Sequence, residues 1–141
     1  MFMGEYSHTV DVKGRLIIPA KFRESLGEEF VVSKGLDGCL FIHNNKEWQN
    51  FVSKLMELPS VKKDARQFSR YFLGGADNVT LDKLGRVLIP EVLRKNAAID
   101  KEVVVIGVGS RIEIWSRERW EGIADDIDAE EIAEQMALLG I

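Results

Sequence analysis

The sequence predicts an α+β fold made of two copies of one small β-rich module, with helices between the copies and at the C-terminus. Two observations lead to this prediction. Residues 11–19 (DVKGRLIIP) recur as residues 82–90 (DKLGRVLIP) at an offset of 71 residues, which indicates an internal duplication. Alternating apolar segments and glycine-containing turns follow both copies, whereas the region between them shows helical spacing.

Each copy is expected to begin with a β-hairpin, because a strand-like segment, a turn that contains glycine and a second strand follow one another. The first strands are expected at residues 6–10 and 79–81, the turns at 11–14 and 82–85, and the second strands through Ile18 and Ile89.

A short helix and two further strands are expected to complete each copy. Pro19 and Pro90 suit the first position of a helix, and Gly27 is suited to end the first one. The helix residues expected to face inward are Phe22, Leu26, Leu93 and Ala97. The strands expected after the helices are 30–33 with 39–43, and 103–106 with 111–115. On this pattern the two modules span residues 5–47 and 76–119.

Residues 48–75 are predicted to form a helical hairpin between the modules and not a flexible linker. Apolar residues at helical spacing fill its first part, Pro59 interrupts the pattern, and a second helical run ends before a pair of glycines. Arg66 and Arg70, one helical turn apart, could add phosphate contacts or simply form a solvated face. The apolar positions of the two runs are Trp48, Phe51, Val52, Leu55 and Met56, then Val61, Ala65, Phe68 and Phe72.

Residues 120–141 are predicted to form an acidic tail with a helix over 129–139. Asp128 and Glu131 have the spacing of a capping box at the start of this helix. We expect its apolar face to need a partner surface, either elsewhere in the chain or on a neighbouring subunit. The residues of that face are Ile132, Met136 and Leu139.

The charge distribution keeps nucleic-acid binding open despite a net charge of −4. No lysine or arginine follows Arg119, whereas seven aspartates and glutamates do. Residues 1–119 therefore carry all 19 basic groups but only 16 of the 23 acidic groups. Residues 1–119 thus have a net charge of 19 − 16 = +3 and the net negative charge lies in the tail, so the main part of the chain is compatible with phosphate contact.

The sequence lacks the features that several classes of protein require. The longest apolar run, residues 103–109, is far shorter than the roughly 20 residues of a membrane span. Residues 1–4 contain no basic stretch that leads into an apolar segment, so we expect no signal peptide there. Cys39, the only cysteine, is expected to be a half-buried strand residue, and with His8 and His43 it is too scattered for a zinc site. We therefore expect a cytoplasmic protein without metal, cofactor or small-molecule substrate.

Asp11 and Asp82 raise one enzymatic hypothesis, because two equivalent halves could bring a pair of carboxyl groups together as general acid and base. Each aspartate, however, lies four residues before an arginine, Arg15 or Arg86, and such a partner lowers the carboxyl pKa. An ionised carboxylate is a poor general acid. No nucleophile motif, phosphate-binding loop or dinucleotide fingerprint occurs either, so we expect no enzymatic activity.

The two DxxxR motifs instead point to DNA binding. Their Arg15 and Arg86, with Lys13 and Lys83 beside them, would lie on turns that protrude from the sheet, where they suit phosphate contact and guanine recognition. The alternative is that each Asp–Arg pair only closes its hairpin by a salt bridge. Leu84 stands where the first copy has Lys13, so the two halves need not contact DNA equally.

Four features in combination resemble the MraZ family of bacterial regulators, whose two modules are similar to the SpoVT-AbrB swapped-hairpin domain. These features are MFMGEY at the N-terminus, the two DxxxR motifs, IIPAKFRE at residues 17–24 and RQFSRYFLGGA at residues 66–76. The resemblance covers essentially the whole chain.

The resemblance implies that the two modules pack as a pseudo-two-fold pair around a small β-barrel core, which brings the DxxxR segments together. It further implies ring-like homo-oligomers, nucleoid association, and binding to repeated double-stranded promoter elements upstream of the division and cell wall gene cluster. The alternative is a ring-forming scaffold or antitoxin-like interaction protein that does not bind DNA.

Overall fold

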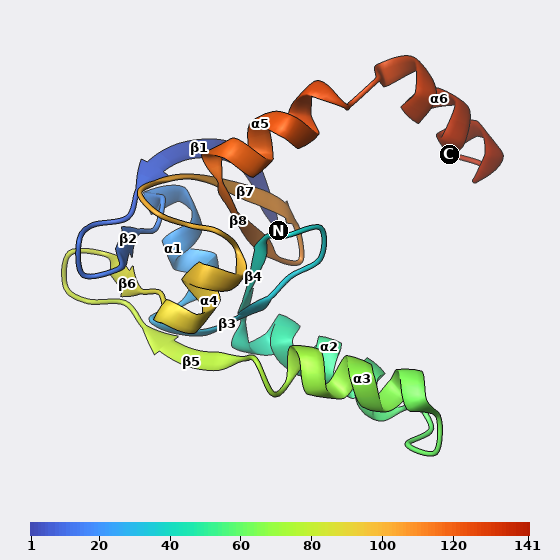
Figure 1. Cartoon of the computed structure of the whole chain (residues 1–141), viewed down its shortest axis with the longest axis horizontal. Coiled ribbons are helices and arrows are strands. Elements are labelled where there is room, and N and C mark those ends of the chain that lie inside the picture. Colours follow the sequence, from blue (N-terminus) through green and yellow to red (C-terminus); the bar gives the residue numbers. More distant parts are fainter.

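The computed structural model describes all 141 residues and has the predicted α+β class, with eight strands and six helices (Figure 1). In chain order the elements are β1 (Phe2–Thr9), β2 (Arg15–Ile17), α1 (Ala20–Leu26), β3 (Glu29–Lys34), β4 (Leu40–Asn44), α2 (Asn45–Met56), α3 (Lys63–Phe72), β5 (Asp77–Thr80), β6 (Arg86–Leu88), α4 (Glu91–Asn96), β7 (Glu102–Gly109), β8 (Ile112–Ser116), α5 (Arg117–Asp125) and α6 (Ala129–Leu138).

Six strands form one antiparallel sheet in the order β1-β7-β8-β4-β3-β5, and β2 pairs with β6 in a separate two-stranded sheet. The first strand of each module pairs with a strand of the other module, since β1 pairs with β7 and β5 pairs with β3. Each module therefore adds an edge strand to the other, and the two halves share one sheet.

The hairpins expected within each copy, β1 with β2 and β5 with β6, are wrong, because β2 pairs with β6 and β5 pairs with β3. β1 pairs along its whole length with β7, and a single isolated bridge between Val10 and Leu16 joins it to β2. β2 pairs instead with its counterpart β6, with Leu16 opposite Val87. This pairing is favoured because Leu16 and Val87 are 0% and 1% exposed in the shared core. The first strands also begin earlier than expected, at Phe2 and Asp77.

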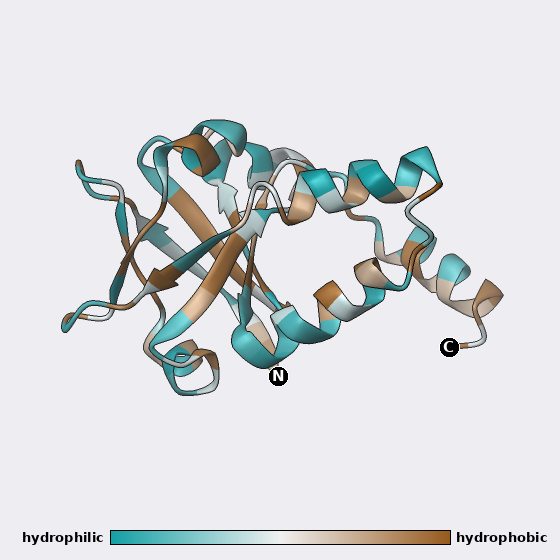
Figure 2. Cartoon of the chain, turned by 90° about the horizontal axis from the view of Figure 1, so that it is seen from below, coloured by the Kyte–Doolittle hydropathy of each residue, from teal (hydrophilic) through white to brown (hydrophobic).

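The main core takes side chains from both modules. Alternate residues of β4 and β7 face this core, as the two-residue period of a strand requires, and Figure 2 shows apolar residues (brown) concentrated on the central strands. The four helix residues expected to face inward are all buried in it, which confirms that prediction. Burial of a large apolar side chain contributes about 1.5–3 kcal/mol. Because both modules supply side chains to this core, removing one module would expose much of the core of the other. The central members are Leu16, Ile18, Phe22 and Leu26 from the first module and Val87, Ile89, Leu93 and Ala97 from the second.

Short helices follow β2 and β6, as expected. Pro19 and Pro90 occupy the N-cap positions of α1 and α4, one residue before the first helical position predicted for them. Gly27 ends α1 as predicted, because its φ of 82° turns the chain out of the helix while its N–H donates to the carbonyl oxygen of Arg23.

α2 and α3 form the predicted helical hairpin between the modules (Figure 1). α2 begins earlier than expected, at Asn45, because the Asn44 side chain accepts a hydrogen bond from the Glu47 N–H and caps the helix. The hairpin covers a second apolar cluster on the opposite face of the six-stranded sheet. Cys39 was expected to be a half-buried strand residue, but it lies just before β4 and is fully buried in that cluster at 1% exposure.

The C-terminal arm consists of α5, which the sequence pattern did not predict, and α6, which it did. Trp120 and Ile123 of α5 pack against the second apolar cluster. The Asp128 carboxylate caps α6 by accepting a hydrogen bond of 2.9 Å from the Glu130 N–H. α6 has no buried residue and extends away from the sheets (Figure 1). No helix combines the length and the apolar character that crossing a bilayer requires.

Candidate functional site

The turn before β2 is held by the side chain of Asp11. Its Oδ1 accepts hydrogen bonds of 2.9 Å from the backbone N–H groups of Lys13 and Arg15. The N–H of Gly14 donates to the Asp11 carbonyl oxygen. The backbone φ of 88° at this position favours glycine, because other residues adopt a positive φ only with steric strain. The DxxGR pattern therefore specifies the whole turn.

The turn before β6 repeats this geometry almost without change. Asp82 Oδ1 accepts hydrogen bonds of 2.9 Å from the N–H groups of Leu84 and Arg86. Gly85 donates its N–H to the Asp82 carbonyl oxygen and has a φ of 78°. The duplicated motif thus builds two equivalent turns, which protrude at the end of the molecule opposite the α2–α3 hairpin (Figures 1 and 2).

Each aspartate also holds the arginine of its own motif. Arg15 Nε lies 2.7 Å from Asp11 Oδ2, and Arg86 Nε lies 2.7 Å from Asp82 Oδ2. The pKa of each carboxyl lies below its usual value. The largest cause is the hydrogen bond from the backbone N–H of the arginine, and the hydrogen bond from the arginine side chain contributes less. Such carboxylates do not suit a general acid. Neither guanidinium makes another hydrogen bond within the chain, so the Nη groups of both are available to a ligand.

Pairing of β2 with β6 brings the two motifs onto one surface. Arg15 lies opposite Leu88, and Arg86 lies opposite Ile17. All four side chains point away from the core, because the residues between them, Leu16 and Val87, point into it. Arg15 and Arg86 are therefore diagonal neighbours, at the roughly 7–8 Å spacing of such positions in antiparallel strands. The sequence-predicted arginines thus lie together on one exposed face.

Two further arginines belong to this region, although the sequence motifs do not include them. Arg23 Nε donates to the carbonyl oxygen of Ile18 at 2.8 Å, and Arg94 Nε donates to that of Ile89 at 2.9 Å. The guanidinium of Arg94 packs against Gly14, and that of Arg23 packs against Gly85 of the other module. Their recurrence at the same offset of 71 residues was the signal that could have identified them.

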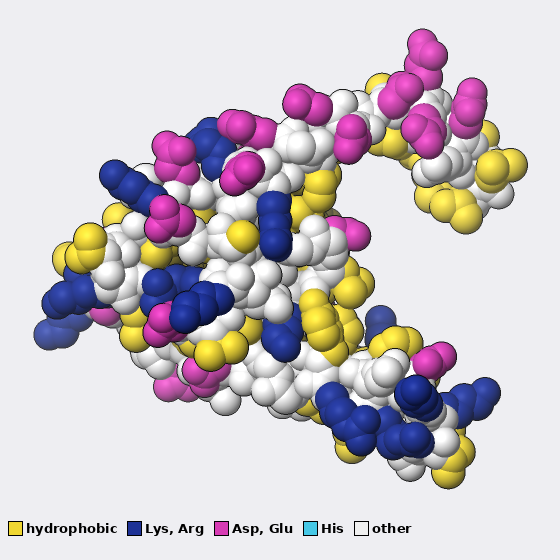
Figure 3. Space-filling model, in the orientation of Figure 1, with side chains coloured by type: hydrophobic (Ala, Val, Ile, Leu, Met, Phe, Trp, Pro, Cys, Tyr) yellow, Lys and Arg dark blue, Asp and Glu magenta, His cyan; other side chains and the backbone are white.

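Lysines complete the basic character of this end. Lys13 and Lys83 are both exposed at the tips of the turns, as expected. Val12 and Leu84 lie beside them and are also exposed, although both are apolar. Figure 3 shows Lys and Arg side chains (dark blue) together with apolar side chains (yellow) at this end of the molecule.

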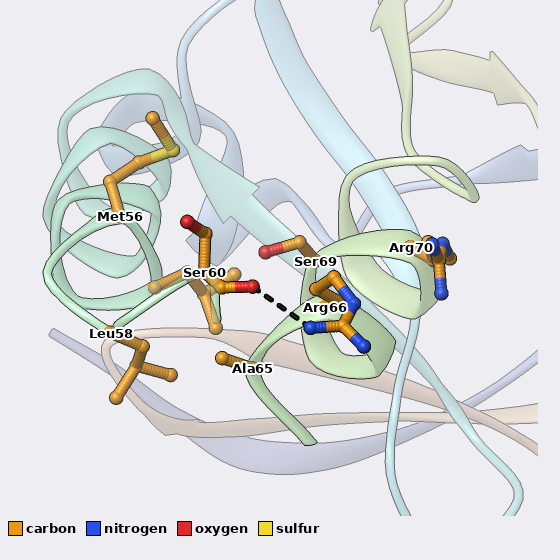
Figure 4. A pocket seen from close by; sticks show the side chains of 8 residues that line it. Met56, Leu58, Ser60, Ala65, Arg66, Ser69 and Arg70 are labelled. Carbon is orange, nitrogen blue, oxygen red and sulfur yellow. Dashed lines mark hydrogen bonds between the residues drawn. The ribbon is translucent and has the colours of Figure 1, made fainter. Parts of the chain in front are cut away.

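The insert contains a different kind of surface. A shallow cavity of about 330 Å³ lies between α2 and α3, and Arg66 at its edge donates a hydrogen bond of 3.0 Å to the carbonyl oxygen of Ser60 (Figure 4). Arg66 also donates a hydrogen bond of 3.0 Å to the carbonyl oxygen of Val61. Arg66 therefore braces the loop between the helices. A larger groove of about 670 Å³ lies on the other side of α3, lined by Lys34, Leu36, Gln67, Phe68, Arg70, Tyr71 and Phe72. No group of three or more His, Cys, Asp or Glu side chains is placed to hold a metal ion.

Comparison with known proteins gives consistent matches over the whole chain. The family model of the MraZ protein, described as antitoxin-like, matches twice, at residues 1–71 and 72–139. The chain is 56% identical over 141 residues to the transcriptional regulator MraZ of Lachnoclostridium phytofermentans, covering 100% of this chain and 99% of the relative. It is 56% identical to the protein of that name from Thermoanaerobacter sp. and 53% identical to that of Acetivibrio thermocellus, each over the full length of both chains.

Proposed function

The chain belongs to the MraZ family of transcriptional regulators, and from this premise we propose that it is a sequence-specific DNA-binding regulator that contacts promoter DNA through its paired DxxxR turns. One observation carries the proposal: because β2 pairs with β6, Arg15 and Arg86 lie on the same face of the strand pair, where their side chains are 31% and 26% exposed. A chain that used its Asp–Arg pairs only to close separate turns would not need the two arginines to be neighbours.

The arginines are suited to base recognition. Asp11 and Asp82 fix each guanidinium through its Nε, which leaves the Nη groups to donate paired hydrogen bonds. Such a fork matches O6 and N7 of guanine in a major groove. Because the carboxylates hold the arginines in place before binding, little side-chain entropy is lost on contact.

The surrounding basic residues are suited to phosphate contact. Lys13 and Lys83 extend from the tips, whereas Arg23 and Arg94 flank the turns. Phosphate contacts of this kind position a protein on the duplex without reading sequence. The acidic arm projects from the opposite end of the molecule, where it would not repel the DNA (Figures 1 and 3).

The fold assignment extends the same proposal. The exchange of β1 and β5 between modules supports a swapped-hairpin arrangement of the SpoVT-AbrB type with a pseudo-two-fold axis between β2 and β6. Family membership supports repeated promoter elements upstream of the division and cell wall gene cluster as the targets. A cytoplasmic location in association with the nucleoid is part of the same proposal.

A ring-like homo-oligomer is also part of the proposal. α6 exposes an apolar stripe and carries acidic side chains, whereas the α2–α3 hairpin exposes apolar residues beside lysines and arginines. Figure 3 shows this contrast between the arm (magenta and yellow) and the hairpin (dark blue and yellow). We expect α6 of one subunit to dock on the groove beside α3 of the next, a head-to-tail contact that generates a ring when it closes.

An electrophoretic shift on the region upstream of the chain's own gene tests the proposed function. DNA binding through Z phosphates should weaken with salt, with a log–log slope near −0.9Z. Specific binding that competitor DNA does not remove is the expected result. Oligomers that form normally without any specific shift would favour the scaffold alternative instead.

A further inference from the structure

The two turns differ only at their tips. Their hydrogen bonds, their glycines and their Asp–Arg pairs are equivalent. At the second position of the DxxxR motif the first turn has Val12 and the second has Lys83. At the third position the first turn has Lys13 and the second has Leu84. Each tip therefore carries one aliphatic residue and one lysine, in opposite order.

The aliphatic residues have no role within the chain. Val12 is fully exposed, and Leu84 is 66% exposed. Neither belongs to an apolar cluster, although both sit on turns otherwise built from polar and charged groups. An exposed aliphatic side chain beside several cations is suited to contact a polyanion that also presents apolar groups. In the major groove of DNA the exposed apolar group is the 5-methyl of thymine.

We propose that Val12 and Leu84 contact thymine methyl groups, and that their opposite placement makes the two half-sites of the recognised element different. This inference rests on the proposed DNA binding. The paired strands present Arg15 and Arg86 symmetrically, so a chain with identical tips would read a palindrome. Reversing the order of the aliphatic residue and the lysine moves the methyl contact to a different position relative to the arginine in each half.

Charge-matched swaps test this inference. V12K/K13L gives the first turn the tip of the second, and K83V/L84K does the reverse. Each variant keeps one lysine and one aliphatic residue per turn, so the net charge of the turn is the same and a changed element cannot be ascribed to a lost charge. Selection from randomised duplexes should give an asymmetric element for the wild type and a more palindromic element for each variant.

Deoxyuridine substitution tests the methyl contact directly, because it removes only the 5-methyl of a thymine. In the selected element, replacing the contacted thymine should weaken wild-type binding by at least about 5-fold. The same replacement should cost V12A or L84A nothing further at the position that each residue contacts, which is the signature of a direct pair in a double-mutant cycle.

The outcomes separate this inference from the proposed function. A palindromic wild-type element, an unchanged element in both swaps, or equal uracil penalties in wild type and alanine variants would each refute the methyl-reading tips while leaving DNA binding intact. Absence of specific binding by any of the proteins would overturn the proposed function and this inference with it.

Discussion

The guanidinium carbon of Arg94 lies 2.7 Å from the position that a β-carbon on Gly14 would occupy. Arg94 belongs to α4 of the second module and Gly14 to the turn of the first, so this contact joins the two halves at the candidate site. Arg23 and Gly85 make the same contact in the other direction. Each turn therefore requires its glycine for two reasons: the positive φ of the backbone, and the space that the arginine of the other module fills.

Substitution of Gly14 separates these two requirements. Gly14→Ala should destabilise the chain by about 1–2 kcal/mol from backbone strain alone. It should also displace Arg94 and break the hydrogen bond to the Ile89 carbonyl oxygen, which costs about 1 kcal/mol more. Urea unfolding of Gly14→Ala, alone and in combination with Arg94→Ala, measures both contributions.

Gly109 provides the matched control for this prediction. Its φ of 89° is almost that of Gly14, but a β-carbon there would meet nothing within 4 Å. Gly109→Ala should therefore show the strain without the displaced contact. Equal losses for the two alanine variants, or no relief of the Gly14→Ala cost when Arg94 is already alanine, would show that the cross-module contact contributes nothing.

The double variant R15A/R86A tests the candidate DNA contacts. It should abolish promoter binding but change the free energy of unfolding little, because partly exposed ion pairs contribute only about 0–1 kcal/mol each. Each single variant should lose roughly 1–3 kcal/mol of binding free energy. Lys54→Ala on α2 removes one positive charge far from the turns and should leave binding near the wild-type level. Wild-type affinity in the double variant would leave the Asp–Arg pairs with a purely structural role.

The elements of this fold could be predicted from sequence because their signals are local. Strand alternation, the glycine turns and the break at Pro59 each lie within a few residues. Local patterns do not predict the pairing, because Phe2 pairs with Gly109 across most of the chain and nothing near β1 distinguishes that partner from β2. Only the resemblance to the swapped-hairpin domain implied that the two modules share a core. α5 was missed because only Trp120 and Ile123 of that helix pack inward, too few to show a helical period.

The candidate site was predicted only where its residues carry a local signal. Arg15 and Arg86 are marked by a repeated local motif, whereas the roles of Arg23 and Arg94 depend on contacts with the opposite module. Such contacts become visible only once the strand exchange is known. The repeat offset identifies these arginines as equivalent to each other but does not say what they touch.

His43 should make the stability depend on pH. Burial lowers its pKa from 6.5 to about 4, with a smaller contribution from Arg111. Between these two pH values the unfolded chain binds more protons than the folded chain, so stability falls as the pH falls. The loss should reach about 3 kcal/mol by pH 4.

Urea unfolding of the wild type and of His43→Phe between pH 7.5 and 4 measures this effect. The phenylalanine ring can keep the stacking on Phe51 and removes the buried, unpartnered Nδ1. As the pH falls, the wild type should lose unfolding free energy relative to His43→Phe, because the variant has no histidine at this position to protonate on unfolding. A difference that stays constant with pH would mean that His43 does not titrate differently in the folded state.

Removal of α6 tests the proposed subunit contact. Truncation after Asp126 leaves α5 on its apolar cluster and deletes the exposed stripe. We expect a smaller oligomer by light scattering, with DNA binding by each subunit retained or strengthened because negative charge is lost. Unchanged assembly would mean that the arm is only a solvated appendage.

Two full-length variants distinguish the stripe from the charge. I132Q/M136Q/L139Q removes the apolar face and keeps every acidic group, whereas E130Q/E131Q/E134Q does the opposite. If apolar burial drives docking, the first variant should dissociate at any salt concentration. If attraction to the basic hairpin drives it, the second variant should dissociate, and the wild type should weaken at high salt.

The operator prediction follows from the two turns of each chain and the proposed ring. One chain presents both turns on one face, so a single subunit should bind as the two-fold dimer of a one-module regulator does. Several subunits in a ring then present several such faces. Binding of a second subunit to nearby DNA is effectively intramolecular, so avidity should exceed single-site affinity by roughly 100-fold to 10,000-fold without new contacts.

Phasing provides the sharpest measurement, because the faces of a ring can meet only sites on one side of the duplex. Spacing between elements should therefore track the helical turn of about 10–10.5 base pairs. Binding is measured to one, two and three copies of the element at constant salt, and then to copies shifted by half a turn. We expect weak binding to one copy, a steep gain with the second, and loss of that gain on the half-turn shift. The α6 truncation should bind one copy as the full chain does but gain little from a second, which ties the effect to assembly. Affinity indifferent to both copy number and phasing would leave a simple single-site binder.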